Sequence, residues 1–134
     1  MSQENVEIVQ AIYDGWQRGD LEASFRHIAE EAEFIAPPDL TGGGRSFRGQ
    51  DGFSESLTEW IGGWDHYHFE LSGLIDCEGE LVLAEGRQRG RGKSSGVEVD
   101  EPIYGLWTLK DGQAVQHRVF RNRSQALEAA GLSE

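Results

Sequence analysis

Residues 96–122 read GVEVDEPIYGLWTLKDGQAVQHRVFRN, and apolar and polar residues alternate through most of this stretch. Alternation on both sides of a Lys-Asp-Gly triplet is typical of two β-strands joined by a tight turn. Two earlier runs alternate in the same way and are followed by short turn-forming segments. Consecutive strands with short turns pair in antiparallel order. We therefore expect an antiparallel meander of four strands, over 66–75, 80–90, 96–109 and 113–122.

The turn in this stretch allows two registers. In a two-residue hairpin, Lys110 faces Gln113, and His117 shares a face with Leu106 and Tyr104. With a bulge at the glycine of the turn, Gly112, His117 lies on the opposite face instead. That face then collects the apolar residues Val99, Ile103, Trp107, Leu109, Val115 and Val119. The second register gives the more coherent apolar face, so we adopt it.

The N-terminal half has the period of helices. The stretch 2–19 places apolar residues three and four positions apart, and a second, short helix after Gly19 carries Leu21, Phe25 and Ile28 on one side. We expect the remaining elements to be a short strand over 33–36 that Pro37 and Pro38 end, a helix over 51–64 and a last helix over 125–130.

Length and charge narrow the class of protein. A chain of 134 residues has the usual size of one domain, so we expect a single domain over 1–134. The formal net charge of -12 repels nucleic-acid phosphates and anionic lipid headgroups, so we expect neither nucleic acid nor a membrane as partner. One cysteine, Cys77, cannot form an internal disulfide. We expect a cytoplasmic protein.

Three motifs favour a plain structural role over a ligand site. The Gly-rich segment 41–45 lacks the Lys-Ser/Thr that ends a phosphate-binding loop. His66 and His68 share a strand face but have no third ligand at suitable spacing, so we expect no metal site and no cofactor. The alternating arginines of 87–91 either bind a carboxylate ligand or pair with acidic side chains across the sheet. Pairing is favoured in so acidic a chain.

These elements resemble a known superfamily. Gly19-Asp20-Leu21 between two helices, Gly49-Gln50-Asp51-Gly52 at the start of a third, and the long meander together resemble nuclear transport factor 2-like proteins. The chain is most similar to their SnoaL-like, polyketide-cyclase and ketosteroid-isomerase branch, whose uncharacterised bacterial members have segments similar to 87–92, 95–99, 107–112 and 126–132. The resemblance implies an α+β fold, in which a cone-shaped, curved antiparallel sheet packs against N-terminal helices around a pocket. It also implies a homodimer.

The resemblance transfers poorly to the catalytic residues. Ketosteroid isomerases carry a base Asp before the proline that ends the first strand, and Ala36 takes that place. Their protonated Asp, two positions before Trp107, falls on Gly105, and their tyrosine falls on Ile12, with Tyr13 one position away. A steroid-type isomerase mechanism is therefore not expected. The fold also hosts cyclases, hydrolases and binding proteins without activity.

Two residues are candidates for acid/base chemistry, and in the chosen register both point with Gly105 into an apolar concavity. His117 could be a neutral base near pH 7, or a buried histidine satisfied by a backbone or tyrosine partner. Glu101 could act as an acid or hold His117, although its place before Pro102 also allows plain exposure. The large rings are too many for a small core, so we expect a ligand pocket lined by Tyr13, Trp16, Trp60, Trp64, Trp107, Ile103 and Val119.

Two functions fit this pattern. The first is a pocket for a small apolar molecule with cofactor-independent acid/base activity of the isomerase, cyclase or hydrolase type. The second is a non-catalytic ligand-binding or dimeric interaction module. The sequence leaves open whether the chain is an enzyme. The open face of the meander would expose Leu106, Tyr104 and Phe120, so we expect two copies to bury them in a homodimer.

Overall fold

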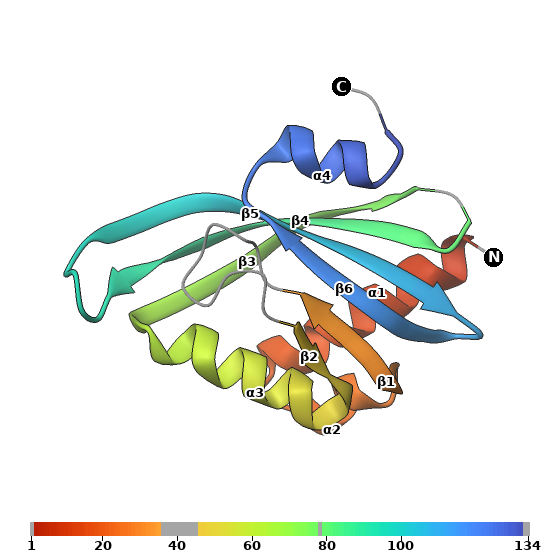
Figure 1. The fold of residues 1–134 in the computed structure, drawn as a ribbon, viewed down its shortest axis with the longest axis horizontal. Coiled ribbons are helices and arrows are strands. Elements are labelled where there is room, and N and C mark those ends of the chain that lie inside the picture. Colours follow the sequence, from red (N-terminus) through yellow and green to blue (C-terminus); the bar gives the residue numbers. More distant parts are fainter. Residues whose placement is uncertain (1, 36–45, 78, 133–134) are drawn as a thin grey trace.

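The computed structural model describes residues 2–35, 46–77 and 79–132, which form one six-stranded sheet with helices on both faces (Figure 1). Ala36 and the Gly-rich segment 41–45 lie outside the described residues. The elements in chain order are α1 (Ser2–Gln17), α2 (Leu21–Phe25), β1 (Ile28–Ile35), β2 (Ser46–Arg48), α3 (Gly49–Gly62), β3 (Trp64–Asp76), β4 (Leu81–Gly92), β5 (Glu98–Lys110), β6 (Gln113–Phe120) and α4 (Arg123–Ala129).

The helical hairpin at the start is confirmed, but its second helix is shorter than expected. Asp20 caps α2 by accepting a hydrogen bond from the Ala23 N–H at 3.2 Å. The helix ends at Phe25, and Ile28 begins β1 instead of continuing the helical face. The cause is a distant partner, since Ile28 lies beside Ala114 of β6 and the Ala114 N–H donates to the His27 carbonyl at 2.7 Å.

The expected meander is confirmed, because β3, β4, β5 and β6 pair in turn in antiparallel order. The sheet as a whole is mixed and not purely antiparallel. Its order is β2-β1-β6-β5-β4-β3, with β1 parallel to β6 and the unexpected strand β2 antiparallel to β1. Both bounds of the helix expected over 51–64 were also wrong, since α3 begins at Gly49 and ends at Gly62, and Trp64 begins β3.

The turn between β5 and β6 combines the two registers of the sequence analysis. Asp111 and Gly112 have φ angles of 52° and 79°, so the hairpin has a two-residue turn with positive φ at both positions. The ladder then shifts between Thr108 and Leu109, which leaves Val115 as the extra residue of a bulge. The expected bulge at Gly112 was wrong, yet the shift restores the expected face.

Beyond the bulge, His117 lies on the same face as Trp107, as predicted, but its partner across the strands is Trp107, because Gly105 pairs with Val119. Ala114, and not Val115, joins the buried residues of that face, because it pairs with Leu109 on the turn side of the bulge.

Two apolar clusters occupy the two faces of the sheet. The inner cluster lies between the sheet and the helices α1 and α3, and contains Val9, Ile12, Tyr13, Phe34, Phe53, Val82, Ala84, Trp107 and Leu109. The outer cluster lies under α4 and contains Leu83, Tyr104, Leu106, Ala126, Leu127 and Ala130. Figure 1 shows α4 alone on this second face of the sheet.

The outer cluster removes the argument given for a homodimer. Tyr104 and Leu106 are 7% and 3% exposed in a single chain, because α4 covers them. Phe120 also packs against this cluster, although it is only partly buried. The homodimer stays a prediction that rests on the resemblance alone.

The charged half of the outer face contains ion pairs between neighbouring strands. Arg87 pairs with Asp100, and Arg91 pairs with Glu98 at 3.1 Å, both across β4 and β5. The interpretation of these arginines as partners of acidic residues is therefore confirmed for two of the three.

Among the described residues, no helix is both long enough and apolar enough to cross a membrane.

Candidate functional site

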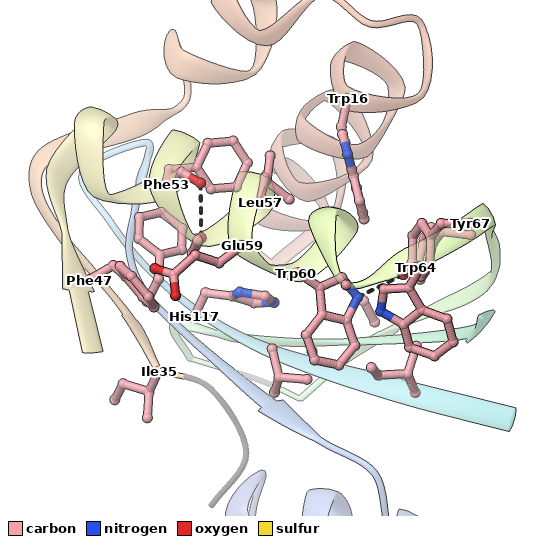
Figure 2. A pocket seen from close by; sticks show the side chains of 18 of the residues that line it. Trp16, Ile35, Phe47, Phe53, Leu57, Glu59, Trp60, Trp64, Tyr67 and His117 are labelled. Carbon is pink, nitrogen blue, oxygen red and sulfur yellow. Dashed lines mark hydrogen bonds between the residues drawn. The ribbon is translucent and has the colours of Figure 1, made fainter. Parts of the chain in front are cut away.

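A pocket of about 470 Å³ opens between the inner face of the sheet, α1 and α3 (Figure 2). All seven side chains predicted to line a pocket belong to its wall: Tyr13, Trp16, Trp60, Trp64, Ile103, Trp107 and Val119. His117 lines it as well, whereas Glu101 does not. Further rings that the sequence analysis did not single out complete the wall: Phe34, Phe47, Phe53, Tyr67 and Phe69.

Rings that pack against one another hold this wall in place. Tyr13 of α1 stacks on Phe69 of β3, with ring centroids 5.5 Å apart. Trp64 lies 6.0 Å from Trp60 of α3 and 5.4 Å from Tyr67 of β3. Aromatic pairs at these separations are favourable contacts. Because the rings contact each other and are stiff, they keep the helices apart from the sheet and leave the cavity between them.

The deep end of the pocket has two polar groups above one glycine. The Trp107 indole N–H donates to the Tyr13 hydroxyl oxygen at 3.1 Å. The His117 ring stacks on Trp107, with centroids 4.0 Å apart. A Cβ atom added to Gly105 would lie 2.6 Å from His117 Nε2 and 3.0 Å from the Tyr13 hydroxyl oxygen. Both atoms therefore lie directly over Gly105, where any side chain would collide with them, and we name this pair of polar atoms above Gly105 the deep polar point.

Burial controls the protonation of both groups. Desolvation lowers the pKa of His117 to about 3, so the imidazole is neutral at physiological pH. Desolvation also raises the pKa of Tyr13, and the hydrogen bond from Trp107 only partly offsets it, so the phenol keeps its proton. Within the described part of the chain, neither the Tyr13 proton nor the His117 ring has a hydrogen-bond partner. The deep polar point can therefore offer hydrogen bonds to a ligand.

Glu101 lies elsewhere. It was expected in the concavity or against His117, but its carboxylate accepts two hydrogen bonds from Arg121, at 2.9 and 3.0 Å. It accepts a third from the Gln88 side-chain amide at 3.2 Å. These partners lower the pKa of Glu101, with the Arg121 hydrogen bond as the largest cause. Arg121, which follows β6, thus holds the Glu101 carboxylate outside the pocket wall.

A chain of hydrogen bonds still connects Glu101 with the pocket. The Trp60 indole N–H donates to the Tyr67 hydroxyl oxygen at 3.1 Å, and the Tyr67 O–H donates to Gln88 Oε1 at 3.1 Å. Gln88 is 1% exposed and links this pair to Glu101. Sequence reasoning missed Tyr67, Gln88 and Arg121. The pairing of Gln88 with Glu101 across β4 and β5 could have been found from the strand register.

No three His, Cys, Asp or Glu side chains come together as a potential metal site anywhere in the ranges that the structure describes. His66 and His68, the one pair considered for a metal, are exposed on β3 and do not line the pocket.

This fold is that of a known class of small proteins. The family model of the SnoaL-like domain matches residues 9–117, and the chain belongs to that family. No curated protein matches the chain.

Solved structures of similar fold cover nearly the whole chain. A nuclear transport factor 2-like protein from Burkholderia thailandensis is 23% identical with a TM-score of 0.79, over 96% of this chain and 98% of that one. TerC, co-crystallised with polyporic acid, is 20% identical with a TM-score of 0.76 over the same shares. A protein described as a SnoaL-like polyketide cyclase from Jannaschia sp. CCS1 is 20% identical with a TM-score of 0.73, over 98% of this chain and 94% of that one. At these identities the likeness shows the fold.

Proposed function

We propose that the protein binds a small, mainly apolar molecule in this pocket and holds one of its oxygen atoms at the deep polar point. The observation that carries the proposal is the convergence of His117 Nε2 and the Tyr13 hydroxyl on the space above Gly105. Binding pockets are mostly apolar, with a few placed polar groups that orient the ligand. This pocket has that composition.

The chemistry of the wall indicates the kind of ligand. Aromatic faces favour flat, apolar molecules, which can stack on them. A neutral imidazole and a protonated phenol provide hydrogen bonds without charge, so they suit a carbonyl or hydroxyl oxygen. TerC, which has this fold, was crystallised with polyporic acid, and that compound is one probe for the pocket.

Acid/base turnover is a second candidate function, and the same convergence favours it. A hydrogen-bond donor and an imidazole beside one ligand oxygen can stabilise negative charge on that oxygen and exchange a proton with its neighbouring atoms. An imidazole with a pKa of about 3 is a weak base, however, so binding is the primary proposal and turnover the second. In the absence of turnover the chain is the binding module of the sequence analysis.

The binding proposal is tested by comparing 1-naphthol with naphthalene, with tryptophan fluorescence as the readout. We expect 1-naphthol to bind roughly fivefold more tightly, because one added hydrogen bond contributes on the order of 1 kcal/mol. Tyr13→Phe and His117→Gln should each reduce this preference. Gly105→Ala should weaken both probes, because its methyl group would lie 2.6 Å from His117 Nε2 and would push that ring out of place.

His68→Gln is the matched control, because His68 is an exposed histidine of β3 that does not line the pocket. It should bind both probes as the wild type does. Equal affinity for the two probes in the wild type, or equal effects of His68→Gln and His117→Gln, would contradict the proposal.

Turnover is tested with 2-tetralone, a flat ketone, in deuterated water. Loss of the proton signals next to the carbonyl, followed by NMR, reports acid/base chemistry. We expect the wild type to exchange these protons at least about tenfold faster than His117→Gln if a general base contributes. Equal rates in the wild type, His117→Gln and buffer would leave binding as the function and remove the second candidate.

A further inference from the structure

The hydrogen bonds between Glu101 and the pocket wall run in one direction only. A carboxylate has no proton to give, so Gln88 must present its NH₂ group to Glu101. Its carbonyl Oε1 then faces Tyr67 and accepts the Tyr67 O–H. The Tyr67 oxygen is left to accept the Trp60 indole N–H. The charge of Glu101 thereby sets the donor and acceptor of every bond as far as Trp60.

The burial of Gln88 makes this order matter. Gln88 is 1% exposed, so its two polar ends depend on protein partners. Buried amides without partners are costly, and each end of Gln88 has one partner of the required kind. Arg121 holds the Glu101 carboxylate with two hydrogen bonds and keeps it ionised. The chain is therefore anchored at the surface and ends in the pocket.

We propose that Glu101 is a positioning residue, which acts through Gln88 and Tyr67 to hold the Trp60 ring and to keep the Tyr67 hydroxyl turned away from the ligand. With both polar tips used inside the chain, this wall presents ring faces to the pocket. The oxygen of a ligand is then directed to the deep polar point. In this last respect the inference rests on the proposed binding function.

Replacing the carboxylate by an amide tests the direction of the chain. In Glu101→Gln the new side chain can donate to Gln88 Oε1, so Gln88 can turn over and present its NH₂ group to Tyr67. The Tyr67 O–H is then released towards the pocket. Size and shape at position 101 are nearly unchanged, so a change at Trp60 reports hydrogen-bond direction and not lost packing.

The readout is the indole N–H signal of Trp60 in ¹⁵N-labelled protein, assigned from its loss in Trp60→Phe. We expect Glu101→Gln to move this signal and to speed its hydrogen exchange by roughly tenfold, because its acceptor changes partners. Asp100→Asn is the matched control. Asp100 precedes Glu101 on β5 and pairs with Arg87 on the outer face, so it should leave the Trp60 signal in place.

A double substitution tests whether the effect passes through Tyr67. Tyr67→Phe removes the hydroxyl that joins Trp60 to Gln88, so adding Glu101→Gln should then leave the Trp60 signal unmoved. The inference is overturned if Glu101→Gln leaves the signal in place in the otherwise wild-type chain. It is also overturned if Asp100→Asn moves the signal equally, or if the shift survives in Tyr67→Phe.

An acid titration of the wild-type protein tests the same inference and does not depend on whether a substituted protein folds. The groups that face Glu101 are Arg121 after β6, Gln88 on β4 and Tyr67 on β3. Protonation of Glu101 should move the Trp60 signal at a pH below the ordinary range of a glutamate, since Arg121 lowers the pKa of Glu101. A Trp60 signal that does not move while Glu101 protonates would overturn the inference.

The consequence for binding is measured separately with the two naphthalene probes. Glu101→Gln should raise the affinity for 1-naphthol without a matching rise for naphthalene, whereas Asp100→Asn should change neither. If neither probe binds any form of the protein, the binding proposal fails while the NMR result still decides the role of Glu101. An unchanged ratio in a protein that binds both probes would contradict the part that concerns the ligand.

Discussion

The same strands form both faces of the sheet, but the two faces are packed differently. On β4 and β5, Leu83 and Leu106 point to the outer face, whereas Ala84 and Trp107 point to the inner one. The outer face is sealed by a helix of seven residues, while the inner face, covered by two long helices, keeps a cavity of about 470 Å³. A larger cover therefore did not produce a tighter fit.

Side-chain size explains the difference. Ala126 and Ala130 let α4 approach the sheet closely, and both are at most 4% exposed. On the inner face, large rings stand between the sheet and the helices, and Tyr13, Phe69 and Trp16 rest on one another. Stiff rings cannot collapse into the space between them. The small residues of α4 therefore allow close packing on the outer face, whereas the contacting rings leave a cavity on the inner face.

The largest effect should come from removing bulk on the sealed face. Leu83→Ala should lower the free energy of unfolding by about 2–5 kcal/mol, because Leu83 is fully buried and the cavity it leaves has no outlet. Leu57→Ala, in the pocket wall, should cost less than about 1.5 kcal/mol, since that side chain is only partly buried and already borders a cavity. Urea unfolding measures both. Equal losses would contradict the contrast between the faces.

An effect of intermediate size concerns His117 on the inner face, which should make the free energy of unfolding depend on pH. The pKa of His117 is lowered to about 3 in the folded chain. As the pH falls below about 6.5, the unfolded histidine takes up a proton that the folded one does not, so stability is lost between pH 6.5 and 3. The loss by pH 5 should be on the order of 1–2 kcal/mol, at the lower end because His117 borders a pocket that water can enter.

Replacing His117 by glutamine should remove that part of the pH dependence. Urea unfolding at pH 7 and pH 5 compares the wild type, His117→Gln and the exposed control His68→Gln. The control should follow the wild type. If His117→Gln loses as much stability between these pH values as the wild type does, the ring is not desolvated in the folded chain.

The smallest effect is at the end of the helix that seals the outer face. Asn122 caps α4 by accepting the Gln125 N–H at 3.0 Å, and its loss in Asn122→Ala should cost about 1 kcal/mol. Asn5→Ala, which removes an exposed hydrogen bond to the Gly79 carbonyl, should cost less. Thermal unfolding of the two variants measures the difference. A larger loss in Asn5→Ala would show that this cap does not hold α4 on the sheet.

The elements that depend on neighbours in the chain could be predicted from the sequence, and those that depend on distant partners could not. The alternation in β5 and β6 is local, and so is the Asp111-Gly112 turn. The start of β1 at Ile28 is set by Ala114, some 86 positions along the chain, and no pattern around Ile28 shows it. The bulge was misplaced but His117 was assigned to the right face, because either bulge changes the register by one residue.

The candidate site also divides into features that depend on local sequence, which could be predicted, and features that depend on distant partners, which could not. The tyrosine and tryptophan rings named in the sequence analysis could be predicted because they are too many and too large for a core of this size, whereas Tyr67 and the phenylalanines of the wall were missed. Glu101 was placed in the concavity because its strand position points there. Its actual surroundings depend on Gln88 of β4 and on Arg121 beyond β6, and the geometry of a carboxylate between them is not visible in either segment alone.

The parallel pairing of β1 with β6 has a consequence for the order in which the chain can assemble. During synthesis, β1 emerges early, but apart from the three-residue strand β2 its pairing partner is β6, close to the other end of the chain. Contacts between residues so far apart in sequence form slowly and late. The deep polar point needs Tyr13 from α1 and His117 from β6. A ribosome-bound chain that stops before residue 113 therefore leaves β1 without its partner β6 and β5 without its second neighbour, and it lacks His117 at the deep polar point.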